Sequence, residues 1–263
     1  MHVSLNQSTF PHLSTARFLE VAAIAGAESV ALHPLAGTES LETIAAAVRA
    51  GGIPVTAVNA LMNWALPDDA APPEAFDLLL DVATAVASPL LVCVAPLRVG
   101  GLPPHADIMR SATERLGALA SVAREAGVRL ALEQVGRSST TPDADSGIRR
   151  FGDALAIADG IADDVGLVAD SYNLATAGET FDIIRTVPPS RLAIAHLADR
   201  DAGHTHRVLP GRGDLNIDTF VRALSDSGYA GPLSLELFPP APWPDPLAFA
   251  RTAVTTVKRY MRS

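Results

Sequence analysis

Short apolar runs and longer amphipathic stretches alternate along the whole chain. Each apolar run is four or five residues long and is bounded by polar or turn-forming residues. Runs of this kind predict buried β-strands. The expected strands cover residues 2–5, 29–32, 54–58, 90–94, 129–132, 166–169, 192–195 and 232–235.

Between these runs, apolar residues recur three and four positions apart, which predicts an amphipathic helix after each strand. Ser14 is expected to cap the first helix and Gly26 to end it, and Pro246 suits the first turn of the last helix. The expected helices lie within residues 18–24, 41–48, 76–86, 108–126, 151–161, 181–187, 217–225 and 245–261.

Eight strand–helix units in 263 residues predict an α/β fold, a (β/α)8 TIM barrel that forms a single domain over residues 1–263. A doubly wound sheet is the alternative. It would more often show a glycine-rich phosphate turn after an early strand. No GxGxxG sequence follows the first strand, and Gly211 and Gly213 lie in a loop that is interpreted as a turn.

Composition narrows the classes of function. The hydrophobic content of 48% suffices for a large core, and the net charge of −9 argues against nucleic acid and against an anionic membrane surface. The single cysteine, Cys93, lies in an apolar run and cannot form an internal disulfide, which fits a cytoplasmic protein. Residues 1–10 are too polar for the core of a signal peptide, and no apolar run is long enough to span a membrane.

Four ionisable residues stand where the last four strands end: Glu133, Asp170, His196 and Glu236. In a parallel barrel these positions face one cavity mouth. Crowded carboxylates repel one another unless a cation is present, and carboxylate-rich ligation with one imidazole suits Mn²⁺, Mg²⁺ or Co²⁺, with Zn²⁺ also compatible. Any one of these residues alone could be a solvated cap or loop charge. Together they predict a site for one divalent metal ion.

Several segments resemble the xylose isomerase-like TIM-barrel proteins of the sugar phosphate isomerase/epimerase superfamily. They are LALEQ, GLVADSYNLATAG, LAIAHLAD, RVLPGRGDLNIDTFVRAL and GYAGPLSLELF, and they cover roughly residues 129–238. The resemblance implies that Glu133, Asp170, His196 and Glu236 bind the metal, with Mn²⁺ as the first expectation, and that Arg207 contacts substrate. It also implies homodimers or homotetramers. The chain departs from the family at Asn173, where a histidine is common.

The resemblance implies a sugar or polyol-ketone isomerase or epimerase in which Glu133 and Glu236 transfer protons through an enediolate. The same segments also resemble 3-dehydroshikimate and inosose dehydratases, so a metal-dependent lyase stays an alternative. Asn173 can bind a substrate hydroxyl but cannot shuttle a proton, which keeps a non-catalytic binding barrel open. A DNA-repair endonuclease of this fold would need more histidine ligands and a basic surface.

Further residues are expected on the same face of the barrel. Asn6, His33 and Trp64 are candidates for contact with a small carbohydrate or cyclic polyol substrate, although Trp64 could simply pack under its loop. Arg137 could bind an anionic group. His204 and His206 could form a second metal site with Asp199 and Asp201, although a solvated loop is the plainer interpretation.

Overall fold

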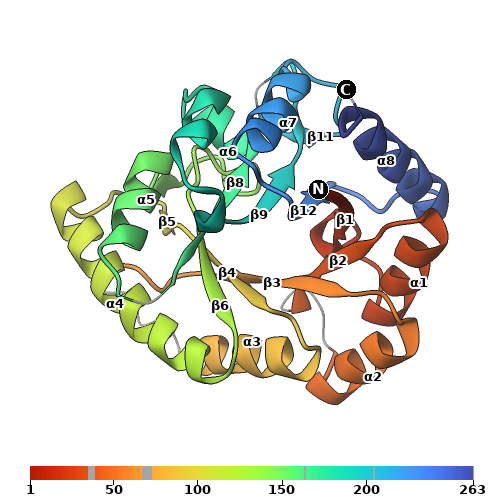
Figure 1. The fold of residues 1–263 in the computed structure, drawn as a ribbon, viewed down its shortest axis with the longest axis horizontal. Helices are drawn as coiled ribbons and strands as arrows, with labels where there is room; N and C mark the ends of the chain where they lie inside the picture. The colour runs from red at the N-terminus through yellow and green to blue at the C-terminus, as the bar shows by residue number, and fades with distance from the viewer. Residues whose placement is uncertain (35–38, 67–72, 163, 204, 263) are drawn as a thin grey trace.

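The computed structural model of the chain describes residues 1–34, 39–66, 73–162, 164–203 and 205–262. Eight parallel strands close into a barrel in the order β1-β12-β9-β8-β6-β4-β3-β2 (Figure 1), so the predicted (β/α)8 fold is confirmed. The barrel strands are β1 (His2–Asn6), β2 (Ser29–Leu32), β3 (Val55–Leu61), β4 (Leu90–Val94), β6 (Arg129–Glu133), β8 (Gly166–Asp170), β9 (Leu192–Leu197) and β12 (Pro232–Leu235).

Helices surround the barrel in Figure 1 and cover the outer face of its sheet. They are α1 (Thr15–Ala25), α2 (Leu41–Gly51), α3 (Pro73–Ala85), α4 (His105–Glu125), α5 (Phe151–Asp159), α6 (Ser171–Thr176), α7 (Ile217–Asp226) and α8 (Pro246–Tyr260). The predicted ends of α1 are confirmed: the Ser14 side chain accepts from Arg17 N, and Gly26 adopts a left-handed φ of 82°.

The connection between β8 and β9 differs from the expectation. The expected helix over residues 181–187 is a 3₁₀ helix, η3 (Phe181–Thr186), and the α-helix of this unit is α6, which begins directly after β8. Within the described residues, two further 3₁₀ turns, η1 (Gln7–Thr9) and η4 (Pro189–Arg191), lie next to β1 and β9. A helix of six residues is too short to show a hydrophobic period.

Two small antiparallel sheets lie in the loops. β5 (Leu97–Arg98) pairs with β7 (Asp145–Ser146), and β10 (Asp199–Arg200) pairs with β11 (Arg207–Val208). The second pair fixes the segment that carries Arg207 beside β9. Pairs of two residues leave no alternating pattern in a sequence, so they were not predicted.

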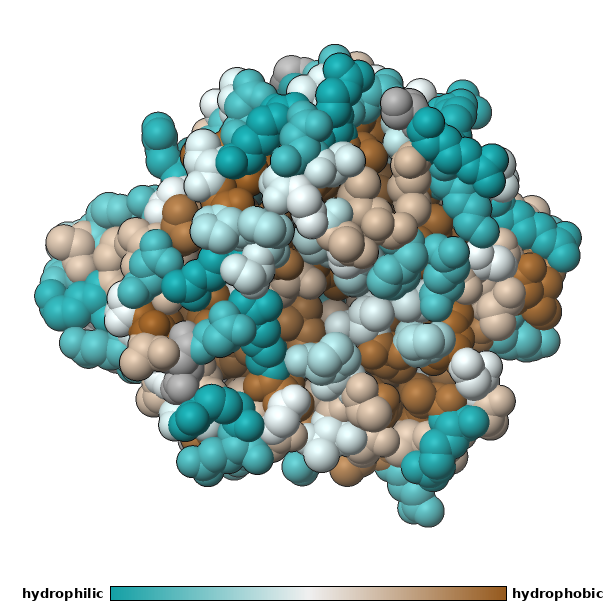
Figure 2. Space-filling model, viewed as in Figure 1, coloured by the Kyte–Doolittle hydropathy of each residue, from teal (hydrophilic) through white to brown (hydrophobic). Residues whose placement is uncertain are grey.

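The side chains inside the barrel fall into two zones. Two residues before the last inward-facing position of each strand, the side chains are small or branched, for example Ala31, Ala131 and Ile194. The last interior positions are mostly polar and form the site described below. On the face shown in Figure 2, hydrophilic side chains gather toward the rim and hydrophobic ones are visible between them. Among the described helices, none combines the length and apolar character needed to cross a membrane.

Candidate metal centre at the ends of the barrel strands

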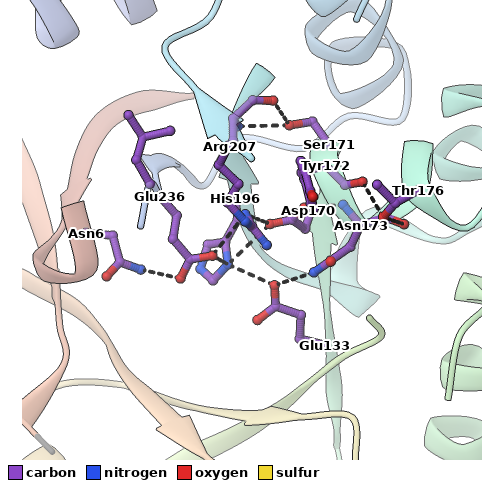
Figure 3. A network of polar contacts seen from close by, with 12 residues as sticks. Asn6, Glu133, Asp170, Ser171, Tyr172, Asn173, Thr176, His196, Arg207 and Glu236 are labelled. Carbon is purple, nitrogen blue, oxygen red and sulfur yellow. Dashed lines mark hydrogen bonds and ion pairs between the residues drawn. The ribbon is translucent and has the colours of Figure 1, made fainter. Parts of the chain in front are cut away.

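The residues expected to bind a metal come together in the structure. Glu133 ends β6, Asp170 ends β8, His196 lies near the end of β9 and Glu236 follows β12 (Figure 3). One ligand atom from each of the four residues lies within 4.8 Å of the others, and all four residues are buried. The shared cavity mouth inferred from strand ends is therefore present.

His196 occupies the middle of this group. Its Nδ1 lies 3.3 Å from Glu133 Oε1 and 3.4 Å from Glu236 Oε2. Asp170 Oδ2 lies 4.0 Å from the same nitrogen. A single nitrogen thus faces three carboxylates, and the opposite ring nitrogen, Nε2, is buried without a hydrogen-bond partner among the described residues.

Arg207 supplies a positive charge beside the carboxylates. Its Nη1 donates to Asp170 Oδ2 at 2.6 Å and lies 3.2 Å from Glu236 Oε2. The guanidinium lies over the Tyr172 ring, 4.9 Å from its centroid, and over the Phe238 ring at 5.2 Å. Cation–π contacts with two rings hold the guanidinium in place, and the side chain is only 5% exposed. These two aromatic partners were not predicted from the sequence.

Three amides orient the two glutamates. Asn6 Nδ2 and Asn59 Nδ2 both donate to Glu236 Oε1, at 2.9 and 3.2 Å. Asn173 Nδ2 donates to Glu133 Oε1 at 3.1 Å. Asn173 sits in the first turn of α6, where its backbone N–H donates to the capping Asp170 Oδ1 at 2.6 Å. The residue that departs from the family pattern therefore fixes a member of the cluster.

Burial and charge separate the two glutamates electrostatically. Burial raises the pKa of Glu133 to about 7, although His196 opposes the shift. Burial acts in the same direction on Glu236, but His196 and Arg207 outweigh it and lower its pKa to about 2. Burial also opposes the charged form of His196, yet Glu236 and Glu133 prevail and raise its pKa well above 6.5. Without a metal, bound protons on Glu133 and His196 therefore offset the negative charge that a bound cation would otherwise offset.

The donor set fits a divalent ion. Ligand atoms around an ion with bonds of roughly 2.1 Å lie roughly 3.0–4.2 Å apart in octahedral geometry, and the separations around His196 Nδ1 are 3.3, 3.4 and 4.0 Å. Three buried carboxylates next to one guanidinium leave negative charge that a bound cation would compensate. Carboxylate oxygens with one imidazole suit Mn²⁺, Mg²⁺, Co²⁺ and Zn²⁺ alike.

A pocket of about 340 Å³ opens over the cluster. Glu236 lines this pocket together with four other residues named as substrate or catalytic candidates: His33, Glu133, Asn173 and Arg207. Arg137 also lines this pocket, next to the hydroxyl residues 138–140. The remaining wall is largely apolar and consists of Ala60, Met62, Val94, Leu97, Val135 and Phe238.

The structure corrects the expectation for Trp64 and changes that for Asn6. Trp64 is 1% exposed, is not part of the pocket wall, and donates from its indole to Val94 O at 2.8 Å. Its loop folds the ring into the core because the indole N–H finds a backbone acceptor there. Asn6 is fully buried and touches Glu236 rather than the pocket space.

The second metal site considered from the sequence does not assemble in the described residues. Asp199 is buried and accepts from the backbone N–H groups of Gly211, Gly213 and Leu215, so it builds the turn. Asp201 accepts from the backbone of Thr205 and His206. His204 lies outside the described residues. Both carboxylates are thus occupied by backbone donors.

Fold and site together define a class: parallel (β/α)8 barrels with a buried carboxylate–imidazole cluster at the strand ends. The chain belongs to the xylose isomerase-like TIM barrel family, whose family model matches residues 19–253. The resemblance stated from the sequence is therefore confirmed.

Relatives and solved structures agree with this assignment. A protein named inosose isomerase from Halalkalibacterium halodurans is 30% identical over 194 residues, which cover 70% of this chain and 66% of that protein. Another inosose isomerase, from Bacillus subtilis, is 29% identical over 141 residues, 51% of this chain and 49% of its own length. The matches thus span about half to two thirds of these relatives.

Two crystal structures share the fold at lower identity. The IOLI protein with a bound zinc atom superposes with a TM-score of 0.82 at 24% identity, covering 99% of this chain and 96% of that one. D-allulose 3-epimerase from Methylomonas sp. in complex with D-allulose has a TM-score of 0.82 at 17% identity, covering 99% and 97%.

Proposed function

We propose that this protein is a divalent-metal-dependent isomerase or epimerase of a sugar-like polyol ketone, with an inosose as the first candidate substrate. The observation that carries the proposal is the pair formed by Glu133 and Glu236. Both approach His196 Nδ1, at 3.3 and 3.4 Å, and both line the pocket. Two carboxylates in one pocket can remove and return a proton at neighbouring carbons or on opposite faces of one carbon.

The ion would be held by Glu133, Asp170, His196 and Glu236, whose donor atoms are already gathered. When bound, it would polarise the carbonyl and hydroxyl oxygens of the substrate, which acidifies the C–H between them. Mn²⁺ is the first choice because carboxylates form most of the donor set, and the zinc atom in the IOLI structure makes Zn²⁺ the first alternative.

The chain's own residues divide the remaining work. One glutamate accepts the proton from the substrate carbon, and the other, or the same one on the opposite face, returns it. Arg207 lines the pocket, and its Nη1 contacts Asp170 Oδ2 at 2.6 Å and Glu236 Oε2 at 3.2 Å, which places a positive charge beside the reacting groups. Asn173 donates to Glu133 and so holds that carboxyl toward the pocket. The apolar wall excludes water from the reacting carbons.

The relatives support the choice of an inosose. Inosose isomerases match this chain at 29–30% identity over about half or more of its length. The pocket combines a polar floor at the metal ligands with an apolar wall. A cyclic polyol presents hydroxyls at its edge and C–H groups on its faces, which suits both surfaces.

The test is proton exchange in deuterated water. The protein is loaded with Mn²⁺ or Zn²⁺, mixed with inososes, keto-hexoses and 3-dehydroshikimate, and followed by NMR. We expect metal-dependent deuterium incorporation next to the carbonyl, with an isomer or epimer as product. Glu133→Gln and Glu236→Gln should lower it by roughly 10²–10⁴-fold, whereas Glu125→Gln, at an exposed site on α4, should leave it unchanged.

Other outcomes identify the rivals. Loss of a β-hydroxyl with formation of an enone would replace the proposal by a dehydratase. Binding of a polyol ketone without exchange at any carbon, in protein shown to contain the metal, would identify a non-catalytic barrel. Full activity in metal-free protein would remove the metal from the mechanism.

A further inference from the structure

The side of His196 that faces away from the carboxylates has no assigned role. The residue is 0% exposed, and its Nε2 has no hydrogen-bond partner among the described residues. If Nδ1 binds a metal, the proton of the neutral ring lies on Nε2 and needs an acceptor. Metal-binding histidines almost always donate this second N–H to a carboxylate, a carbonyl or a water.

Two serines on neighbouring strands also have buried side-chain atoms without a hydrogen-bond partner among the described residues. Ser234 is the register partner of His196 across the β9–β12 pair, and Ser4 is the register partner of Ser234 across β12–β1. Both serines are 0% exposed, and neither Oγ has a hydrogen-bond partner among the described residues. Three unpaired polar atoms therefore come from consecutive strands of the barrel.

These three side chains point to the same side of the sheet. Ser234 stands two residues before Glu236, and Ser4 stands two residues before Asn6. The side chains of Glu236 and Asn6 both belong to the site, where they contact one another at 2.9 Å. Residues two apart on a strand share a face. The serine hydroxyls thus lie inside the barrel, beneath the cluster.

The interior layer below the site is mixed in size. Ala31, Ala57 and Ala131 on β2, β3 and β6 are small, whereas Val92, Val168 and Ile194 on β4, β8 and β9 are branched. A buried water needs two to four polar partners and space that is not filled by side chains. The two hydroxyls and the imidazole nitrogen supply the polar partners, and the three alanines are the smallest side chains of this layer.

We propose that one buried water beneath the metal centre accepts from His196 Nε2 and is held by the hydroxyls of Ser234 and Ser4. The water fixes the tautomer and tilt of the ring so that Nδ1 points at the metal. Ser234 and Ser4 are then positioning residues that act through His196. This inference rests on the metal site of the proposed function and is independent of the substrate.

The first measurement is metal affinity by calorimetry with Mn²⁺ and Zn²⁺. We expect Ser234→Ala and Ser4→Ala to weaken binding by about tenfold, at the lower end of the range for outer partners of metal ligands. Ser234→Thr keeps a hydroxyl and should restore most of the affinity. Ser29→Ala is the matched control, since it removes another buried barrel serine whose hydroxyl pairs with His2 instead, at 3.1 Å.

The second measurement follows the Nε2–H proton of His196 by NMR in protein labelled with ¹⁵N-histidine. A proton bonded to a trapped water should exchange slowly with solvent in the unaltered protein and faster in Ser234→Ala. A crystal structure at high resolution should show the water between the three atoms.

Several outcomes would overturn the proposal. Equal loss of affinity in Ser29→Ala and Ser234→Ala would reduce the effect to general destabilisation. Unchanged affinity and proton exchange in both serine variants would remove the water bridge. If Ser234→Ala does not fold, Ser4→Ala and the Nε2–H signal of the unaltered protein decide. If the unaltered protein binds no ion, the proposed function fails, and the Nε2–H signal of the metal-free protein still tests the water.

Discussion

The two halves of the barrel end in different chemistry. The interior positions at the ends of β1 to β4 are neutral in character and belong to Asn6, His33, Asn59 and Val94. Those at the ends of β6, β8, β9 and β12 belong to Glu133, Asp170, His196 and Glu236. The second half supplies the four candidate ligands, and Asn6 and Asn59 of the first half donate to one of them, Glu236.

The contrast shows how a symmetric fold builds an asymmetric site. Asn6 and Asn59 of the first half both donate to Glu236 Oε1. Their amides leave the other oxygen of Glu236 free to face His196 and Arg207. Outer partners of this kind orient ligands without changing their charge. Replacing a ligand of the second half should therefore weaken metal binding strongly, whereas replacing an amide of the first half should weaken it only moderately.

The largest effect should follow from a change in the charged half. Asp170→Asn keeps a capping side chain at the start of α6 but loses the carboxylate that faces Arg207 and His196. We expect metal affinity to fall by on the order of 10²–10³-fold. Calorimetry with Mn²⁺ and Zn²⁺ measures it. Asp145→Asn, at an exposed position on β7, is the control, and an equal loss there would contradict the assignment.

A change of pH should act through the same half. Between pH 4.5 and about 7, the folded metal-free protein keeps a proton on Glu133 that the unfolded chain releases, so its unfolding free energy falls as pH rises. His196, with its raised pKa, continues the fall above 6.5. A metal ion replaces these protons, so its affinity should rise about tenfold per pH unit for each proton displaced.

Thermal unfolding from pH 5 to pH 8, with and without metal, measures this effect. The gap in Tm between loaded and metal-free protein should widen with pH. Glu236 should add nothing in this range, because its lowered pKa of about 2 leaves it ionised throughout. A constant gap would show that the cluster releases no protons to the ion.

Changes in the neutral half should be milder. Asn6→Ala and Asn59→Ala each remove one donor to Glu236 Oε1, and we expect metal affinity to fall about tenfold for either. Asn63→Gly, in the loop after β3, is the control, because its φ of 54° suits glycine and its side chain is exposed. If Asn6→Ala or Asn59→Ala lowered metal affinity as much as Asp170→Asn, the proposed difference between the two halves would be wrong.

The smallest effect on the site should come from Trp64. Trp64→Phe removes the hydrogen bond to Val94 O but keeps an aromatic ring at this position in the core. Unfolding free energy should fall by about 1–2 kcal/mol, while metal affinity and KM stay unchanged. Chemical denaturation and calorimetry measure the two quantities. A large rise in KM with normal stability would restore Trp64 to the substrate site.

The sequence predicted the charged half better than the neutral half, for a physical reason. Glu133, Asp170, His196 and Glu236 each follow an apolar run, and strand ends in a barrel converge whatever the loops do. The amides of Asn6 and Asn59 contact Glu236 only because the barrel closes, and no local sequence pattern predicts such a long-range contact. Tyr172 and Phe238 around Arg207 were missed for the same reason.

Loop residues were the least predictable. Trp64 turned inward because a backbone carbonyl of β4 was within reach of its indole, which depends on the path of the chain after β3. The helix α6 escaped notice because it begins at once after β8, with Asp170 serving both as its cap and as a candidate ligand. Strand periodicity and helix periodicity overlap at such a junction, and neither pattern is long enough to prevail.

The pairing of β1 with β12 also bears on biosynthesis. β12 closes the barrel and delivers Glu236, and β1 contributes Asn6, the amide that holds it. On the ribosome, a nascent chain that has not yet reached β12 carries Glu133, Asp170 and His196 without the fourth donor. The assembled centre therefore forms after the last strand is synthesised and docks against the first. Metal loading at the proposed centre would in consequence be a late step in the maturation of the chain.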